Sequence, residues 1–188
     1  MMLGRILAEK KPNIIKRWFD VILETYPADT VDFLKKQKNR FTNPVGSTIY
    51  HGIENIFDEI LREAAIEKAP PFLDSIIRIR AVQDFTPSKA VSFIFSLKKI
   101  ISEELRSNAS ENVIFEELQS LESRIDALAL TSFDIFMECK EKIYEIKANE
   151  AKRMTYRLLR QANLITENQE NETPENSFMD IKRKEAAQ

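Results

Sequence analysis

The feature that most constrains the fold is a long stretch without proline or glycine, which runs from about Ser110 to Pro174. Along it apolar residues recur in alternating steps of three and four, a heptad pattern that is interrupted at Lys142 and that places one apolar stripe on a helix. An unbroken helix from about Ser110 to Leu164 would span roughly 80 Å, whereas a small domain is only about 30 Å across. We therefore expect the distal half of this helix to project, to bend back or to pair with a second chain.

Helix-start signals divide the rest of the chain into shorter apolar segments. Pro12 is expected in the first turn of a helix that Pro27 ends, and Asn43-Pro44 and Thr86-Pro87 each combine a capping residue with a proline at the first helical position. Pro70-Pro71 breaks one helix and opens another. With only 3 glycines for hairpin turns, the sequence predicts an all-α fold, a helical bundle of about six helices.

Three regions follow from this pattern. Residues 1–140 are expected to form an all-α sensor-like domain, and residues 141–165 a polar extension of the last helix. Residues 166–188 are rich in Glu, Asn and Gln with few apolar side chains, which is typical of a disordered tail.

Charge and cysteine content exclude several classes of function. The formal net charge is only -2, so a nucleic-acid footprint is not expected. No apolar run of about 18 residues occurs, and the N-terminus is charged too early for a signal peptide, so no membrane insertion is expected. The single cysteine fits a reducing compartment, and we expect a cytoplasmic protein.

The residues that could support chemistry are few. His51 is the only histidine, and a nucleophile–base pair or an axial haem ligand would have to use it. His51 and Cys139 cannot supply the roughly four ligands of a zinc site. We therefore predict no catalytic residue, no metal and no cofactor.

One corner between two expected helices concentrates polar side chains. It carries three cations, an amide and a carboxylate, and it is either a structural turn or a partner-facing or anion-sensing surface. The candidate interaction surface is Arg78, Arg80, Gln83, Asp84 and Lys89.

The heptad stripe of the long helix is the second candidate surface. Its apolar residues are expected to form the seam of a homodimer, and the same helix would pass the state of the domain to an unidentified regulatory protein. The candidate dimer seam is Leu118, Leu121, Ile125, Leu128, Ile135 and Ile146.

Three stretches resemble one known family, the N-terminal domain of RsbRD-type co-antagonists of the bacterial sigma-B stress pathway. They are residues 18–27 (WFDVILETYP), 41–51 (FTNPVGSTIYH) and 77–97 (IRIRAVQDFTPSKAVSFIFSL). The resemblance implies a globin-like, non-haem sensor domain that dimerises and is joined by a linker helix to a C-terminal STAS domain. Only a short polar tail follows Leu164 here, so kinase binding and the phosphorylated threonines of STAS domains are not carried over.

Two functions from different classes remain open. The first is a non-catalytic signalling module that acts by helix-mediated dimerisation and protein partner binding. The alternative is a sensor that binds haem, another tetrapyrrole or a fatty acid between its helices, with His51 as the available axial ligand. An enzyme is not expected.

Overall fold

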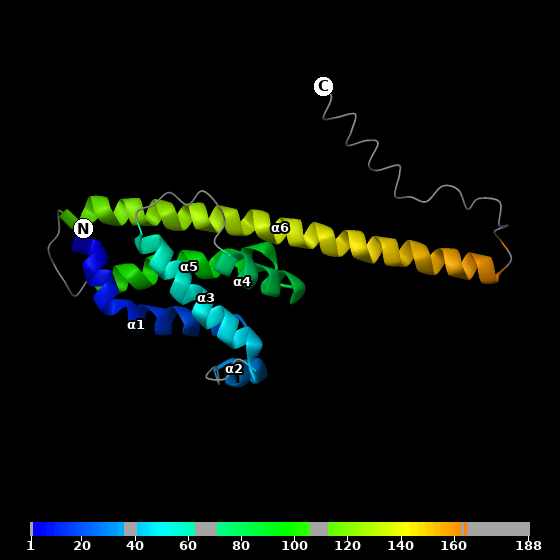
Figure 1. Ribbon diagram of the computed structural model, residues 1–188, viewed down its shortest axis with the longest axis horizontal. Coiled ribbons are helices and arrows are strands. Elements are labelled where there is room, and N and C mark those ends of the chain that lie inside the picture. The colour runs from blue at the N-terminus through cyan, green and yellow to red at the C-terminus, as the bar shows by residue number, and fades with distance from the viewer. Residues whose placement is uncertain (1, 36–40, 63–70, 106–112, 163, 165–188) are drawn as a thin grey trace, which may run out of the picture. The chain divides into compact units, whose positions relative to one another are not determined.

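The computed structural model describes residues 2–35, 41–62, 71–105, 113–162 and 164. Six helices and no strands occur among the described residues, which confirms the all-α fold class (Figure 1). The helices are α1 (Met2–Leu23), α2 (Ala28–Lys35), α3 (Pro44–Leu61), α4 (Pro71–Val82), α5 (Pro87–Leu105) and α6 (Val113–Gln161).

The chain divides into two compact units, residues 1–143 and residues 144–188. Helices α1 to α5 and the first part of α6 belong to the first unit, and the last part of α6 belongs to the second. The predicted polar tail, residues 166–188, lies outside the described residues.

Helix α1 begins ten residues before the proline that was expected to start it. Pro12 lies inside the helix, so that prediction was wrong. Leu3 and Leu7 upstream are buried, and the amide of Leu3 donates to Glu117 Oε2 at 2.8 Å, which anchors the extra turns. Burial of that apolar stripe outweighs the hydrogen bond that an interior proline removes. The helix changes direction along its length in Figure 1, as an interior proline is expected to cause.

The three predicted helix starts at later prolines were confirmed, since α3, α4 and α5 begin at Pro44, Pro71 and Pro87. Helix α3 already ends at Leu61, and residue 70 lies outside the described residues, so Pro70-Pro71 is not what ends it. The side chain of Asn43 caps α3 by accepting from the amide of Gly46 at 2.9 Å. A Cβ at Gly46 would lie 2.7 Å from the carbonyl oxygen of Leu34, so the close approach of α2 to α3 requires glycine there.

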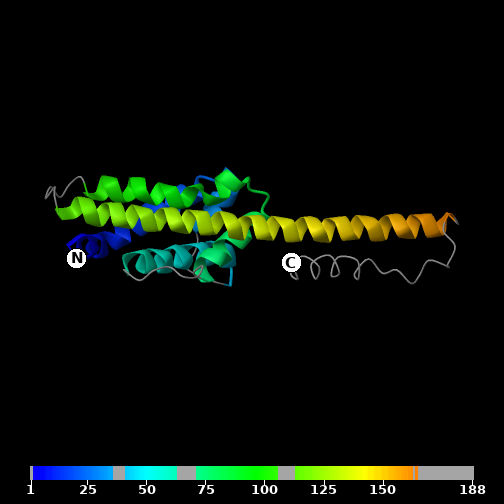
Figure 2. The same cartoon turned by 90° about the horizontal axis from the view of Figure 1, so that it is seen from above.

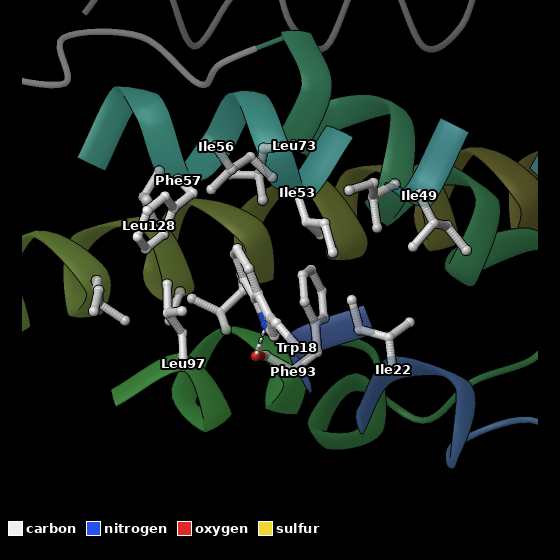
Figure 3. Close-up of a cluster of buried hydrophobic side chains, with 14 of the residues drawn as sticks. Trp18, Ile22, Ile49, Ile53, Ile56, Phe57, Leu73, Phe93, Leu97 and Leu128 are labelled. Atoms are coloured by element: carbon white, nitrogen blue, oxygen red, sulfur yellow. Dashed lines mark hydrogen bonds between the residues drawn. The ribbon is translucent and has the colours of Figure 1, made fainter. Parts of the chain in front are cut away.

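The core of the first unit contains side chains from all six helices, with Leu34 from α2, and Figure 3 shows a part of it. Trp18 lies fully buried near its centre, and its indole Nε1 donates to the carbonyl of Phe93 at 2.7 Å, which satisfies the one polar atom of the ring. Leu128 of α6 lies beside Phe57 and Leu97 in the same cluster. The first part of α6 is therefore a structural member of the bundle rather than an appendage to it.

Helix α6 runs alongside α5 over this first part (Figure 2). An ion pair between Lys98 Nζ and Asp126, 2.7 Å apart, joins the two helices. At the start of α6, Glu117 accepts from the first amides of α1. These contacts fix which side of α6 faces the bundle, and hence which side is left for other partners.

Candidate functional site

The predicted dimer seam lies mostly inside the protomer. Leu121, Ile125, Leu128 and Ile135 are buried in the core cluster, and Leu118 is half-buried against it. Only Ile146 is exposed, at 58%. Helices α1, α3, α4 and α5 pack on this side of α6, so the four buried residues are not available to a second copy while the domain is folded.

A different apolar stripe of α6 is exposed in the first unit. Leu130, Phe133 and Met137 have relative exposures of 69%, 44% and 38%. Leu130 lies about 160° around the helix from Leu128, since each residue advances about 100°. The described part of this unit therefore leaves one large apolar patch on α6 uncovered.

The same spacing of seven residues occurs in the second unit. Leu130, Met137, Tyr144, Ala151 and Leu158 follow one another at intervals of seven residues, and all five are exposed. The sequence positions between them in the distal part, Ala148 and Thr155, are small and also exposed. Such a repeat is the pattern of a helix that packs against another helix.

The face that carries Ile146 does not keep an apolar pattern. The next residues at heptad spacing on that face are Asn149 and Arg153. The first stripe thus becomes polar soon after Cys139, the last of its buried residues, while the positions at intervals of seven from Leu130 stay apolar or small to Leu158.

Sequence reasoning missed the second stripe although its spacing was present in the sequence. The first stripe has larger aliphatic residues, which made it the stronger heptad. The exposed stripe mixes aromatic, methionine and alanine residues, so its heptad pattern is weaker in the sequence. It can be recognised as a separate packing surface only once the first stripe is seen to be buried.

The second candidate region is the corner between α4 and α5. Asp84 lies there with a positive φ of 58°, a left-handed conformation that is uncommon outside glycine and asparagine. Its carboxylate is 3.3 Å from Lys140 Nζ of α6, so an ion pair connects the corner to α6.

Arg80 was predicted to lie on an interaction surface, and the structure corrects this. Its side chain is fully buried, with 0% exposure. Nη2 donates to Thr25 Oγ1 and to the carbonyl of Lys89, both at 3.0 Å. The guanidinium carbon lies 4.2 Å from the centre of the Phe85 ring and 5.6 Å from that of Tyr26. Cation–π contacts with these rings and the apolar packing of its aliphatic side-chain stem make burial of the arginine possible.

Two nitrogen atoms of Arg80, Nε and Nη1, are buried without a hydrogen-bond partner among the described residues. Burial lowers the pKa of this guanidinium, and the nearby Tyr26 opposes that change. Burial likewise raises the pKa of Tyr26, and Arg80 opposes it. Arginine stays protonated even so, because its ordinary pKa lies above about 12.

The structure brings three of the other predicted corner residues to one open cavity. Gln83, Asp84 and Lys89 line it, and the Gln83 Oε1 accepts from the Tyr26 hydroxyl at 3.0 Å. Its volume is about 400 Å³. The full lining is Thr25, Tyr26, Pro27, Thr30, Gln83, Asp84, Phe85, Thr86 and Lys89.

Arg78 is not part of this group. It lies on the exposed side of α4, where its Nε is 2.6 Å from Asp74. That hydrogen bond is the main cause that raises the pKa of Arg78. The corner is therefore a cavity backed by one buried cation, with Arg78 as a separate surface ion pair.

His51 lies on the exposed side of α3. Its Nδ1 is 3.1 Å from Glu54 Oε2, and its ring contacts that of Tyr50 edge-on. Nothing in this placement directs the imidazole into the core, and its use as a haem ligand stays a prediction. The described residues contain no cluster of three or more His, Cys, Asp or Glu side chains that could hold a metal. No described helix is long and apolar enough to cross a membrane.

Comparison with known proteins shows which family this chain resembles. A protein of Archaeoglobus fulgidus, described only as an uncharacterized protein, is 22% identical over 148 residues, which cover 74% of this chain and 83% of that protein. No solved structure matches. The model of the RsbT co-antagonist protein rsbRD N-terminal domain matches residues 12–151, well over half of the chain. That is a family of signalling domains and not a known enzyme family. The matched range includes all three stretches, residues 18–27, 41–51 and 77–97, on which the resemblance in the sequence rests. This chain belongs to the family of RsbT co-antagonist protein rsbRD N-terminal domains.

Proposed function

We propose that this chain is a non-catalytic signalling module that forms a homodimer through the exposed stripe of α6 and passes its state to a regulatory protein. The observation that carries the proposal is the exposed repeat of seven, which runs from Leu130 to Leu158. Membership of a signalling family supports the regulatory role.

The energetics favour a second copy as the occupant of this stripe. Fully burying a Leu, Met or similar side chain contributes about 1.5–3 kcal/mol. In a symmetric pair each such residue is buried twice, so Leu130, Met137, Tyr144 and Leu158 together could exceed the association cost of about 4–15 kcal/mol. A heptad stripe is also self-complementary, since two copies of it can interdigitate.

The stripe is not uniform along its length. The positions between its larger residues are Asp134 and Glu141 in the proximal part but Ala148 and Thr155 in the distal part. Carboxylates resist burial, whereas small residues let two helices approach closely. We therefore centre the proposed contact on residues 144–162.

The association can be tested with two substitutions on neighbouring residues. Tyr144 and Ile146 are both large, apolar and exposed, yet they lie about 200° apart around the helix. Tyr144→Glu is expected to convert a dimer at micromolar concentration into a monomer in sedimentation velocity, while Ile146→Glu leaves the dimer intact. A wild-type chain that sediments only as a monomer, or equal dissociation by both variants, contradicts the proposal.

The partner role needs a separate experiment. The tagged wild-type chain and the Tyr144→Glu variant are used as paired baits in the native cell, with Ile146→Glu as the matched control. A regulatory protein that binds the wild type and Ile146→Glu and is lost from Tyr144→Glu would link partner binding to the dimer. Equal capture by all three baits would separate the partner site from the α6 stripe.

A further inference from the structure

The least expected group in the domain is Arg80, a buried cation without an acidic partner among the described residues. Burying a charge is costly unless the charge is paired and hydrogen-bonded. Nη2 donates to one hydroxyl and one carbonyl, the guanidinium lies against aromatic rings, and the Tyr26 hydroxyl interacts with it. Nε and Nη1 still have no acceptor at hydrogen-bonding geometry among the described residues. A buried polar group left unsatisfied in this way calls for a ligand, an ion or water.

The cavity at the corner shares its wall with this arginine. Thr25, whose hydroxyl accepts from Arg80, lines the cavity, as do the Tyr26 and Phe85 rings that flank the guanidinium. Arg80 therefore lies directly behind the wall. Phe85 is only half-buried, so movement of its ring is the simplest way to bring the orphan N–H groups to the cavity.

The remaining lining suits an anion with an apolar body. Lys89 adds a second cation, and Thr30 and Thr86 add hydroxyl groups. The Thr25 hydroxyl already donates to the carbonyl of Ile22. Asp84 is the one carboxylate in the lining, and it lies 3.3 Å from Lys140, which offsets its charge. The cavity of about 400 Å³ could hold many waters, each of which takes about 30 Å³ in the liquid. A single inorganic ion would leave most of it empty.

We propose that this cavity binds a small organic acid, with its carboxylate held by Arg80 and its apolar part packed against Tyr26 and Phe85. A charge-assisted hydrogen bond to the carboxylate would satisfy the N–H groups of the arginine and offset the free-energy cost of burying its charge. The ligand would lie where residues after α1 meet the corner between α4 and α5, and it would stabilise that junction. The proposal goes beyond the proposed function and requires no second copy of the chain.

The test uses the full chain with sodium acetate, propionate, benzoate and succinate, and with inorganic phosphate, each compared with sodium chloride at equal ionic strength. At least one carboxylate is expected to raise the midpoint of thermal unfolding by several degrees, because a ligand that binds only the folded state stabilises it. Arg80→Met removes the charge at similar volume and should abolish the rise. Arg78→Met, two residues away on the exposed side of α4, should keep it.

A second readout needs no change at Arg80. In nitrogen-15 NMR spectra of the wild type, the same carboxylate should shift the Nε–H signal of Arg80, and Lys89→Met should weaken binding by removing the second cation from the lining. The proposal is overturned if no carboxylate acts beyond sodium chloride, if only phosphate does, or if Arg80→Met responds like the wild type.

Discussion

The two apolar stripes of α6 share one helix and one heptad spacing but have opposite environments. Residues such as Ile125 and Leu128 lie at 0% exposure in the core, whereas Leu130 and Leu158 are mostly exposed. Helices α1, α3, α4 and α5 determine the difference, because they cover one side of α6 and leave the other open within the described part of the domain. Heptad spacing thus identifies faces able to pack against a helix, but not which helix they pack against.

The largest expected effect is on the stability of the domain. Ile125→Asp places a carboxylate in the core and should lower the free energy of unfolding by roughly 4 kcal/mol or more. Leu130→Asp, on the exposed stripe, should change the stability of the monomer by less than about 0.5 kcal/mol. Urea unfolding under monomeric conditions measures both. A similar decrease in the free energy of unfolding for the two variants would contradict the assignment of one stripe to the core and the other to the surface.

A smaller effect is expected on association, with a gradient along the exposed stripe. Leu158→Glu should weaken the dimer about 10- to 100-fold, or about 1.4–2.7 kcal/mol, because it puts a charge among small, close-packed positions. Leu130→Glu should weaken it less, since Asp134 and Glu141 already make that part polar. Sedimentation equilibrium over a concentration series gives both constants. A larger effect from Leu130→Glu would move the centre of the contact to the proximal part.

The pH dependence of the stability should show whether Cys139, the last buried residue of the first stripe, is shielded from water. Burial raises the pKa of the Cys139 thiol, and nearby Arg78 opposes this. The folded state therefore holds its proton to higher pH than the unfolded state. This contribution is complete below the unfolded pKa of about 8.5 and is lost as pH rises through the folded pKa. Urea midpoints at pH 7.5 and 9.5 should fall more for the wild type than for Cys139→Ala. An equal fall in both would indicate a thiol open to water.

The smallest expected effect is at Ser132, a buried polar residue within the first stripe. Its hydroxyl donates to the carbonyl of Leu128 at 2.6 Å, in its own helix. Ser132→Ala removes the donor without leaving an unsatisfied partner, because that carbonyl belongs to the helical backbone, and alanine favours helix by up to about 0.7 kcal/mol. Chemical unfolding should show a change within about 1 kcal/mol. A large loss would mean that the hydroxyl has a further partner, such as a buried water.

Much of the helical framework could be predicted from the sequence. The caps at Asn43 and Thr86 and the prolines after them start α3 and α5 as expected, because capping and proline geometry act within one turn of backbone. Pro12 was misjudged because the same residue type is tolerated inside a helix when tertiary burial on both sides holds it, as Leu3 and Ile14 do here.

The corner residues mark the limit of local reasoning. Charge alone placed Arg78 and Arg80 together on a surface, but positions two apart on a helix point to different sides. One of them therefore reaches Asp74 in solvent and the other lies among Tyr26, Phe85 and Phe93. The cavity beside Arg80 is lined by residues more than fifty positions apart, which no spacing rule could bring together.

The sequence by itself determined that this chain forms amphipathic helices, where most of them begin, and that the last is long, because these properties depend on side chains within a few turns of each other. Only the tertiary structure decided which stripe of α6 belongs to the core, and that Arg80 is enclosed. Burial depends on which distant helices cover a residue, and that cover is set by packing of the whole bundle rather than by any local pattern.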